Sequence, residues 1–175
     1  MRPIDQGLLV VSPVRNEAAH LQRTARALAA QTRPPDLWVI VDDGSSDRTL
    51  ELARELEGEL EFATVLQAPR APSGRDSLAL AREARAFNYG LRRARWRRFA
   101  FIGKLDGDVE LPPTWFAELL ARFRSDPRLG LAGGRLAEHG RSGWRPIAIP
   151  PTHVHGAVKL YRRECLVAVG GVPER

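Results

Sequence analysis

The chain has 175 residues, of which 43% are hydrophobic and 27% charged, and its formal net charge is +6. This length and composition are typical of one globular domain. No apolar run approaches the ~18 residues of a transmembrane helix, and the first residues lack the apolar core of a secretory signal. The single cysteine, Cys165, excludes an internal disulfide framework and a cysteine metal cluster.

All but two of the 27 basic residues are arginine, the exceptions being Lys104 and Lys159. Arginine favours bidentate contact with phosphates, so nucleotides, nucleic acid and anionic lipid headgroups all fit as partners. The densest arginine cluster, residues 92–98, holds a single aromatic residue, too few for a nucleic-acid platform. Nucleic acid is therefore disfavoured, and a peripheral contact with a membrane surface stays open. We expect a cytoplasmic location, either free or at the inner face of the membrane.

Two apolar runs, residues 8–11 and 37–41, predict the first buried strands. Ser12-Pro13 is expected to close the first strand, and Asn16 to cap the helix that follows it. After the second strand comes Asp42-Asp43-Gly44-Ser45-Ser46-Asp47, in which either serine can cap the next helix. Capping does not explain two adjacent acids at a strand end, where like charges repel. Asp42 or Asp43 is therefore expected to contact a ligand at the carboxyl edge of a sheet.

Further along the chain, strands are expected at residues 62–66, from Phe99, within 129–134 and at 157–161. Helices are expected over residues 76–95, from Pro112-Pro113, and from Arg162 to Gly170-Gly171. In the long helix Arg82 and Arg85 lie off the apolar stripe, where either could reach a diphosphate or stay in water. Residues 138–152 show no periodicity and are expected to form an acceptor-side loop or lid.

The strand from Phe99 ends in Asp106-Gly107-Asp108. Side chains two apart on an extended segment point to the same side, and the intervening glycine lets the backbone turn or approach a ligand. Two hard oxygen ligands suit Mg²⁺ or Mn²⁺, with diphosphate oxygens completing the coordination. Asp-Gly is also a common turn dipeptide, so the motif alone leaves a solvated turn open.

The alternation of strands and helices predicts a three-layer α/β/α domain whose central sheet is parallel at least in its first half. No Gly-x-Gly-x-x-Gly follows the first strand, and there is no Walker A sequence. A nucleotide would therefore be held by carboxylates at strand ends and a metal, without a glycine-rich phosphate loop.

Four motifs, in order, resemble family 2 glycosyltransferases of the GT-A fold, and the likeness covers nearly the whole chain. They are Pro13-Val14-Arg15-Asn16-Glu17, Asp42-Asp43-Gly44-Ser45-Ser46-Asp47, Asn88-Tyr89-Gly90-Leu91 and Asp106-Gly107-Asp108. Tyr161-Arg162-Arg163 and Gly170-Gly171 resemble later landmarks of that family. The resemblance implies transfer of a sugar from a nucleotide-diphosphate donor of the UDP or GDP type. The acceptor, whether a glycan, a lipid or a small molecule, is not identified.

The resemblance also assigns roles by matched position. Asp43 would contact the nucleotide base, Pro13 and Arg15 would line the same pocket, and Arg82 sits where some relatives direct an arginine at the nucleotide. Asp106 would face the ribose or the metal, and Asp108 would bind a divalent Mg²⁺ or Mn²⁺ that bridges the diphosphate. Such a metal stabilises the leaving nucleotide diphosphate as a Lewis acid.

Two departures from the family pattern stand out. Arg15 occupies the place of an aromatic residue that stacks on the base in many relatives, and a guanidinium can stack as well. Relatives carry an acidic catalytic base after the Gly-Gly landmark, so the base is expected beyond Arg175, and the chain is expected to be one domain truncated on its acceptor side. Within the chain, Glu138, His153 and His155 are the remaining candidates for a base.

Two other function classes compete with this reading. A sugar-phosphate nucleotidyltransferase has similar acidic metal chemistry, but it should carry a glycine-rich loop after the first strand, where this chain has Asn16-Glu17. A non-catalytic module that binds nucleotide sugars fits the missing base.

Overall fold

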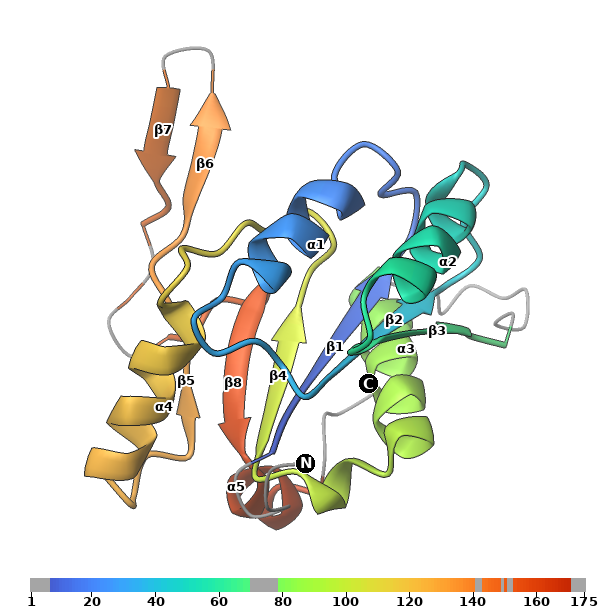
Figure 1. Ribbon diagram of the computed structural model, residues 1–175. Helices are drawn as coiled ribbons and strands as arrows, with labels where there is room; N and C mark the ends of the chain where they lie inside the picture. The colour runs from blue at the N-terminus through green and yellow to red at the C-terminus, as the bar shows by residue number, and fades with distance from the viewer. Residues whose placement is uncertain (1–6, 70–78, 141–142, 149, 151–152, 171–175) are drawn as a thin grey trace.

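A six-stranded sheet with helices on both faces forms the body of the computed structural model, which describes residues 7–69, 79–140, 143–148, 150 and 153–170 (Figure 1). The strands stand in the order β3-β2-β1-β4-β8-β5. β1 is parallel to β2 and β4, β2 is parallel to β3, and β8 is antiparallel to β4 and β5. The strand bounds are β1 Leu8–Val14, β2 Leu37–Asp42, β3 Ala63–Gln67, β4 Phe101–Leu105, β5 Leu131–Ala132 and β8 Val158–Arg162.

The two faces of the sheet are covered by different helices. The bounds are α1 Leu21–Ala29, α2 Thr49–Glu59 and α4 Trp115–Ser125 on one face, and α3 Ala79–Ala94 and α5 Arg163–Ala168 on the other. Successive side chains of a strand point to opposite faces, so Leu8 and Val10 pack with the first group, whereas Leu9 and Val11 pack with the second. The predicted three-layer α/β/α architecture, with a mostly parallel sheet, is confirmed.

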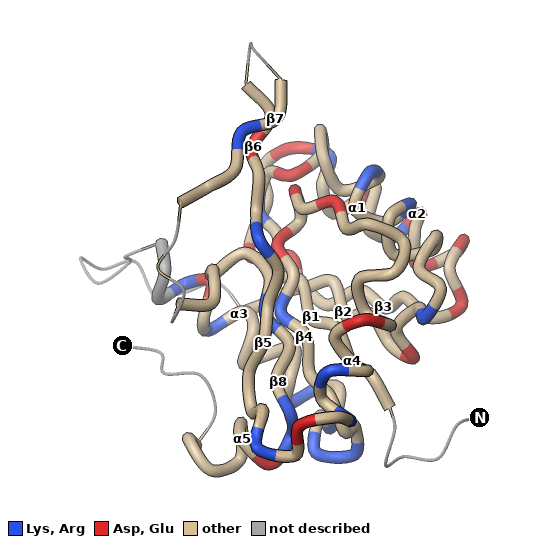
Figure 2. The backbone as a smooth tube through the Cα atoms, turned by 90° about the vertical axis from the view of Figure 1, so that its left-hand side faces the viewer, with Lys and Arg blue, Asp and Glu red and all other residues tan. Residues whose placement is uncertain are grey.

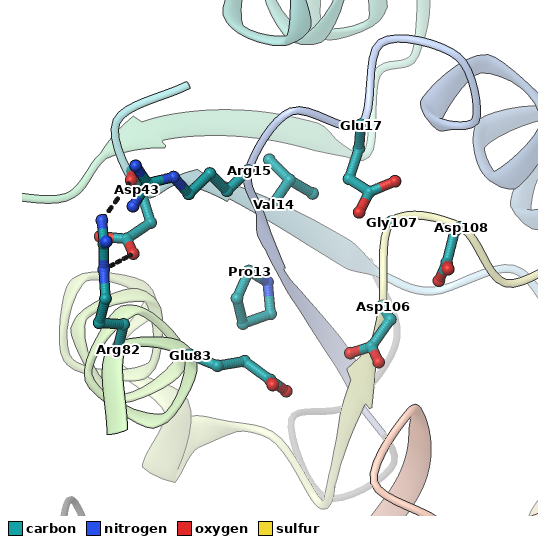
Figure 3. Close-up of a pocket in the computed structure, with 10 residues that line it drawn as sticks. All are labelled: Pro13, Val14, Arg15, Glu17, Asp43, Arg82, Glu83, Asp106, Gly107 and Asp108. Carbon is teal, nitrogen blue, oxygen red and sulfur yellow. Dashed lines mark hydrogen bonds and ion pairs between the residues drawn. The ribbon is translucent and has the colours of Figure 1, made fainter. Parts of the chain in front are cut away.

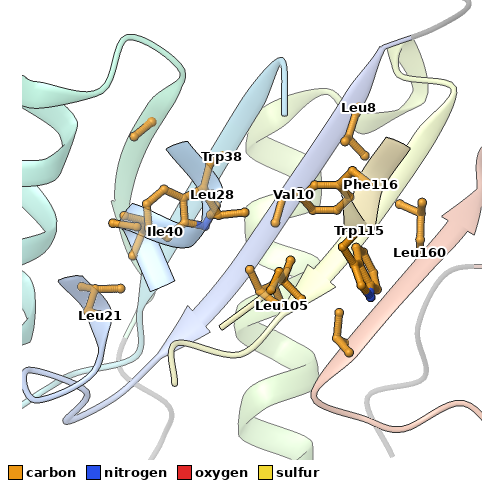
Figure 4. Packing of buried hydrophobic residues seen from close by; sticks show 14 of the residues in the cluster. Leu8, Val10, Leu21, Leu28, Trp38, Ile40, Leu105, Trp115, Phe116 and Leu160 are labelled. Carbon is orange, nitrogen blue, oxygen red and sulfur yellow. The ribbon is translucent and has the colours of Figure 1, made fainter. Parts of the chain in front are cut away.

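The larger core layer is built on side chains of β1 and β2 (Figure 4). Trp38 and Ile40 lie there with Leu28 of α1 and with Phe116 of α4. The buried Ser12 fits this layer because the indole Nε1 of Trp38 donates a hydrogen bond to its Oγ at 2.9 Å. Each buried polar group thereby satisfies the other.

Helix α3 lies unusually close to the sheet at Gly90. A Cβ at this position would stand 2.7 Å from Cγ1 of Val11 and 2.8 Å from Cγ2 of Val41. Real side chains do not approach that closely, so a larger residue would push the helix outward. The glycine of the Asn88-Tyr89-Gly90-Leu91 motif therefore sets the distance between α3 and strands β1 and β2.

Several predicted boundaries differ from the structure. β1 continues through Ser12 and Pro13, and β4 pairs with it only as far as Val11, so the missing N–H of Pro13 interrupts no pairing with β4. The fourth helix begins at Trp115, after the two prolines rather than at them. Gly170 follows α5 with a φ of 76°, as the landmark suggests. The expected start of the long helix near residue 76, and Gly171, lie outside the described residues.

The segment predicted to be a loop, residues 138–152, contains a hairpin. Strands β6 Ala137–Gly140 and β7 Gly143–Pro146 pair in antiparallel register and project from the body of the molecule (Figure 1). Trp144 of β7 is 65% exposed and packs edge-on against the ring of His139 at 5.2 Å between centroids. Strands this short, with most of their side chains exposed, carry too weak an alternation to be found from sequence.

Candidate functional site

A cavity of about 490 Å³ opens at the edge of the sheet where β1, β2 and β4 end (Figure 3). Parallel strands bring their carboxyl ends to one edge, and α3 closes the cavity on one side. The residues lining it are Pro13, Val14, Arg15, Glu17, Asp43, Arg82, Glu83, Asp106, Gly107 and Asp108. All six residues predicted to hold a donor or a metal are therefore brought together, with Arg85 not among the lining residues.

The adjacent acids after β2 have different surroundings. Asp42 is 2% exposed, and its carboxylate accepts hydrogen bonds from the backbone N–H groups of Gly44 and Ser45, each at 3.2 Å. It therefore shapes the turn, whereas Asp43 lines the cavity. Of the two ligand contacts considered from sequence, Asp43 is the one that a ligand can reach.

Asp43 is oriented by Arg82 of α3, which lies 39 positions further along the chain. Nε of Arg82 donates to its Oδ2 at 3.2 Å, and Nη2 of Arg82 lies 3.5 Å from its backbone oxygen. Burial raises the pKa of the Asp43 carboxyl, while the positive charges of Arg15 and Arg85 act to lower it. This end of the cavity offers an oriented carboxylate and two guanidinium groups, a set that suits the polar edge of a base and a phosphate.

Two loops are fastened together beside this carboxylate. Asn16 has a left-handed φ of 57°, its N–H donates to Oγ of Ser45 at 3.1 Å, and its Oδ1 accepts from the N–H of Ser46 at 2.8 Å. The N–H of Glu17 donates to Oγ1 of Thr49 at 2.7 Å. The predicted capping roles of Asn16 and of the serines are therefore wrong, because their polar atoms join the loop after β1 to the loop after β2.

The Asp106-Gly107-Asp108 turn is clamped against β1 and α1 rather than being a solvated surface turn. A Cβ on Gly107 would stand 2.9 Å from Cγ1 of Val14 and 3.1 Å from Cγ of Glu17. The buried hydroxyl of Thr24 donates to the carbonyl of Gly107 at 2.8 Å. With the glycine held there, the carboxylates on either side of it both line the cavity (Figure 3).

Glu17 and Glu83 were not predicted as site residues. Burial raises the pKa of the Glu17 carboxyl, and the charge of Asp108 raises it further, so these two carboxylates act on each other. Glu83 follows Arg82 in α3 and forms an ion pair with Lys104. The position of Glu17 in the first motif could have drawn attention to it, whereas nothing in the sequence pairs Glu83 with Lys104.

Lys104 is the countercharge of the acidic end of the cavity. Its Nζ donates to Oδ1 of Asp106 at 2.5 Å and to the carbonyl of Gly156 at 2.7 Å, and the side chain is 12% exposed. Burial raises the pKa of Asp106 to about 6, although Lys104 opposes that rise. The Asp106 carboxyl therefore ionises near neutral pH, and a cation bound beside it would favour the ionised form.

The acidic residues fit a divalent metal that keeps other ligands. Asp106 and Asp108 are hard oxygen donors, the type that Mg²⁺ and Mn²⁺ prefer. Within the described ranges there is no group of three or more His, Cys, Asp or Glu side chains arranged to hold a metal ion. The pair therefore suits an ion whose remaining ligands are water and phosphate oxygens, rather than one enclosed by protein.

The candidates for a catalytic base lie elsewhere. Glu138 is exposed on β6, His153 is exposed, and Nδ1 of His155 accepts a hydrogen bond from the N–H of Ala157 at 3.1 Å. None of these three side chains lines the cavity. A base beyond Arg175 lies outside the described residues, so these assignments stay predictions.

In the part of the chain that the structure describes, no helix has the length and apolar character needed to cross a membrane.

Comparison with known proteins finds a family match over most of the chain. Residues 9–166 match the family described as "Glycosyl transferase family 2". The hyaluronan synthase of Pasteurella multocida is 32% identical over 130 residues, which are 74% of this chain. The chain spans only 12% of the length of that relative.

Solved structures share the fold. S. aureus TarS 1-349 in complex with UDP superposes with a TM-score of 0.71 at 18% identity, over 97% of this chain and 51% of that one. The mannosyltransferase PcManGT of Pyrobaculum calidifontis, in complex with GDP-Man and Mn²⁺, gives a TM-score of 0.70 at 20% identity, over 95% of this chain and 47% of that one.

Proposed function

Because the chain belongs to glycosyl transferase family 2 and has the GT-A fold, we propose that it transfers a sugar from a nucleotide-diphosphate donor to an acceptor, with the help of a divalent metal ion. The observation that supports this most directly is that one cavity has two chemically different ends. Asp43, Arg15 and Arg82 stand at one end, and the carboxylates of Glu17, Asp106 and Asp108 stand at the other (Figure 3). A nucleotide diphosphate has the matching polarity, with a base at one end and a phosphate-bound metal at the other.

At the base end, the Asp43 carboxylate accepts a hydrogen bond from a ring N–H, which uracil and guanine both present. Arg82 keeps that carboxylate in place through its 3.2 Å hydrogen bond, and Arg15 is free in solvent to stack its guanidinium on the base. Donors of the UDP and GDP types both satisfy this geometry. The neighbouring structures bound to UDP and to GDP-Man support the same two types.

At the acidic end, Asp106 and Asp108 would hold Mg²⁺ or Mn²⁺, and Lys104 keeps the Asp106 carboxylate oriented toward the cavity. The metal supplies Lewis-acid stabilisation of the charge on the leaving diphosphate when it is bound. The structure of PcManGT with Mn²⁺ supports this choice of metal. Glu17 adds negative charge beside the pair, which raises the attraction for a cation further.

On the acceptor side, the attacking hydroxyl must give up a proton, and a positioned base contributes ~10²–10⁴-fold to such a step. Glu138, His153 and His155 are the candidates within the chain. A glycan acceptor is supported by the polysaccharide synthase among the relatives, with a lipid or small molecule as the alternatives. The net charge of +6 supports a cytoplasmic location at the inner face of the membrane, where anionic lipids give a negative surface potential.

The proposal is tested by calorimetric titration of the chain with UDP and GDP, each with and without Mn²⁺. We expect one of the two nucleotides to bind and Mn²⁺ to strengthen that binding. Turnover is then measured with the corresponding nucleotide sugars and oligosaccharide acceptors.

Other results identify the competing functions. Metal-dependent binding without transfer to any acceptor would indicate a non-catalytic nucleotide-sugar module. Release of pyrophosphate from a nucleoside triphosphate and a sugar 1-phosphate would indicate a nucleotidyltransferase. Nucleotide binding of equal affinity with and without Mn²⁺ would contradict the role given to Asp106 and Asp108.

A further inference from the structure

A second cavity, of about 280 Å³, lies between the C-terminal end of α3 and the strands β2 and β3. Apolar side chains of the two strands line it together with three arginines, Arg93, Arg95 and Arg98. The combination of an apolar lining with three cations is unlike the donor cavity, where carboxylates dominate.

A sharp backbone turn brings these arginines together. Arg95 has a left-handed φ of 51° and lies between the end of α3 and the 3-10 helix η2 Trp96–Arg98. The turn lets residues from both sides of it reach one cavity. Left-handed backbone is unfavourable for a long side chain, so the turn is maintained by the packing around it.

Two of the three arginines lie against aromatic rings. The guanidinium of Arg93 lies 5.3 Å from the ring centroid of Tyr89, and that of Arg98 lies 5.2 Å from the ring centroid of Phe99. Among the described residues, no carboxylate forms an ion pair with Arg93, Arg95 or Arg98. Their charges are therefore available to an anionic partner.

Further positive charge surrounds this cavity. Arg97 is exposed and stacks over the ring of Trp96 at 5.2 Å, and Nη1 of Arg163 lies 3.4 Å from the carbonyl of Arg97. Figure 2 shows Lys and Arg gathered at the end of the molecule where α5 lies. We call the surface formed by Arg93, Arg95, Arg97 and Arg98 the basic edge.

We propose that the basic edge docks the protein on an anionic lipid bilayer. Guanidinium groups bind headgroup phosphates, and the apolar lining of the cavity accommodates the less polar part of a lipid. Single-stranded nucleic acid fits less well, because bases need exposed aromatic faces and Trp96 is partly buried under Arg97.

This docking has a consequence for the donor cavity. Arg82 of α3 lines the donor cavity and Arg93 of the same helix lines the second cavity, and eleven helical residues rise about 17 Å at ~1.5 Å per residue. A protein held by its basic edge would therefore keep the donor cavity on the side away from the bilayer, open to nucleotides in solution. The proposal does not depend on the catalytic function, since none of the basic-edge residues lines the donor cavity.

The test is sedimentation with vesicles of phosphatidylcholine alone and with vesicles of equal parts phosphatidylcholine and phosphatidylglycerol. The chain is compared with the triple variant Arg93→Gln/Arg95→Asn/Arg98→Gln, in which asparagine tolerates the left-handed backbone. Each arginine near an anionic surface contributes a factor of about five to binding, so the triple variant should bind the mixed vesicles on the order of a hundredfold more weakly.

The matched control is Arg23→Gln/Arg26→Gln/Arg54→Gln, which removes the same charge from exposed positions on α1 and α2. We expect it to lose less than about fivefold. Arg97→Gln, at an exposed position, should by itself lose about fivefold, and salt should weaken binding of the unmodified chain. Thermal unfolding followed by circular dichroism reports that each variant is folded.

Three results would overturn the proposal. Equal losses in the two triple variants would mean that net charge alone drives binding. Equal binding to vesicles without phosphatidylglycerol would exclude recognition of anionic lipid. Retained vesicle binding in the basic-edge variant, with loss of binding to single-stranded RNA, would identify nucleic acid as the partner.

Discussion

Replacing Asp108 by asparagine isolates the metal-binding role of the acidic turn. In the described part of the chain the Asp108 side chain makes no hydrogen bond or ion pair, and it is exposed, so the fold does not depend on it. Its charge raises the pKa of Glu17, which means that the two carboxylates repel each other. Asp108→Asn should therefore leave the melting temperature of the metal-free protein unchanged or slightly higher.

The effect on metal-dependent binding should be large. Lys104 pairs with both Glu83 and Asp106, so with Glu17 and Asp108 ionised this end of the cavity carries a net charge of −3, which the substitution reduces to −2. Of the two carboxylates proposed to hold the metal only Asp106 remains, and it is already paired with Lys104. Loss of a metal's charge stabilisation costs several kcal/mol, and we expect about 10²-fold weaker binding, or about 2.7 kcal/mol.

Calorimetric titration of UDP and GDP with Mn²⁺ measures this effect. The control is Glu110→Gln, which removes an exposed carboxylate from the same loop, two residues beyond Asp108 and outside the cavity lining. It should leave the dissociation constant within about twofold, because its surface ion pair with Arg23 at 3.7 Å contributes little. If Asp108→Asn bound nucleotide with Mn²⁺ as tightly as the unmodified chain, the turn would have no metal role.

Three further predictions concern recognition of the nucleotide base, the pH dependence of metal-dependent binding, and the packing of α3 on the sheet. Asp43→Ala should weaken UDP or GDP binding about 10-fold or more while sparing pyrophosphate, measured by competition; an equal loss for both would place Asp43 in the metal site instead. Because Asp106 has a pKa of about 6 and only its ionised form binds a cation, Mn²⁺-dependent binding should weaken as the pH falls through about 6, and a flat titration profile would contradict this. Gly90→Ala should lower the free energy of unfolding by about 1–3 kcal/mol in urea titrations, since its Cβ would stand 2.7 Å from a valine methyl. Gly58→Ala, a helical position with nothing within 4 Å, should instead raise it by up to about 1 kcal/mol, and equal effects at the two glycines would refute the packing argument.

The strands and the acids at their ends were predictable from sequence because they depend on local patterns. Apolar runs identified β1 and β2, and the alternation with helices identified the layers. Parallel strands bring their carboxyl ends to one edge, so Asp43 and the Asp106-Gly107-Asp108 motif could be expected to meet there. The described cavity brings them together with Arg15 and Arg82.

The capping predictions that were wrong depended on polar side chains with two available partners. Asn16, Ser45 and Ser46 have the residue types of helix caps, and a capping rule looks only at the next few residues. In the folded chain these side chains are opposite one another across two loops, and hydrogen bonds between the loops replace the caps.

The sequence by itself determined the layers of the fold, the family and six of the residues that line the cavity. Only the tertiary structure decided which of two adjacent acids faces the cavity, that Glu17 stands beside Asp108, and that Lys104 joins Glu83 to Asp106. The physical reason is that these contacts join residues far apart in the chain, as when Thr24 fixes the carbonyl of Gly107 from 83 positions away. Local propensity carries no information about such pairs, whereas the packing of helices on the sheet brings them within hydrogen-bonding distance.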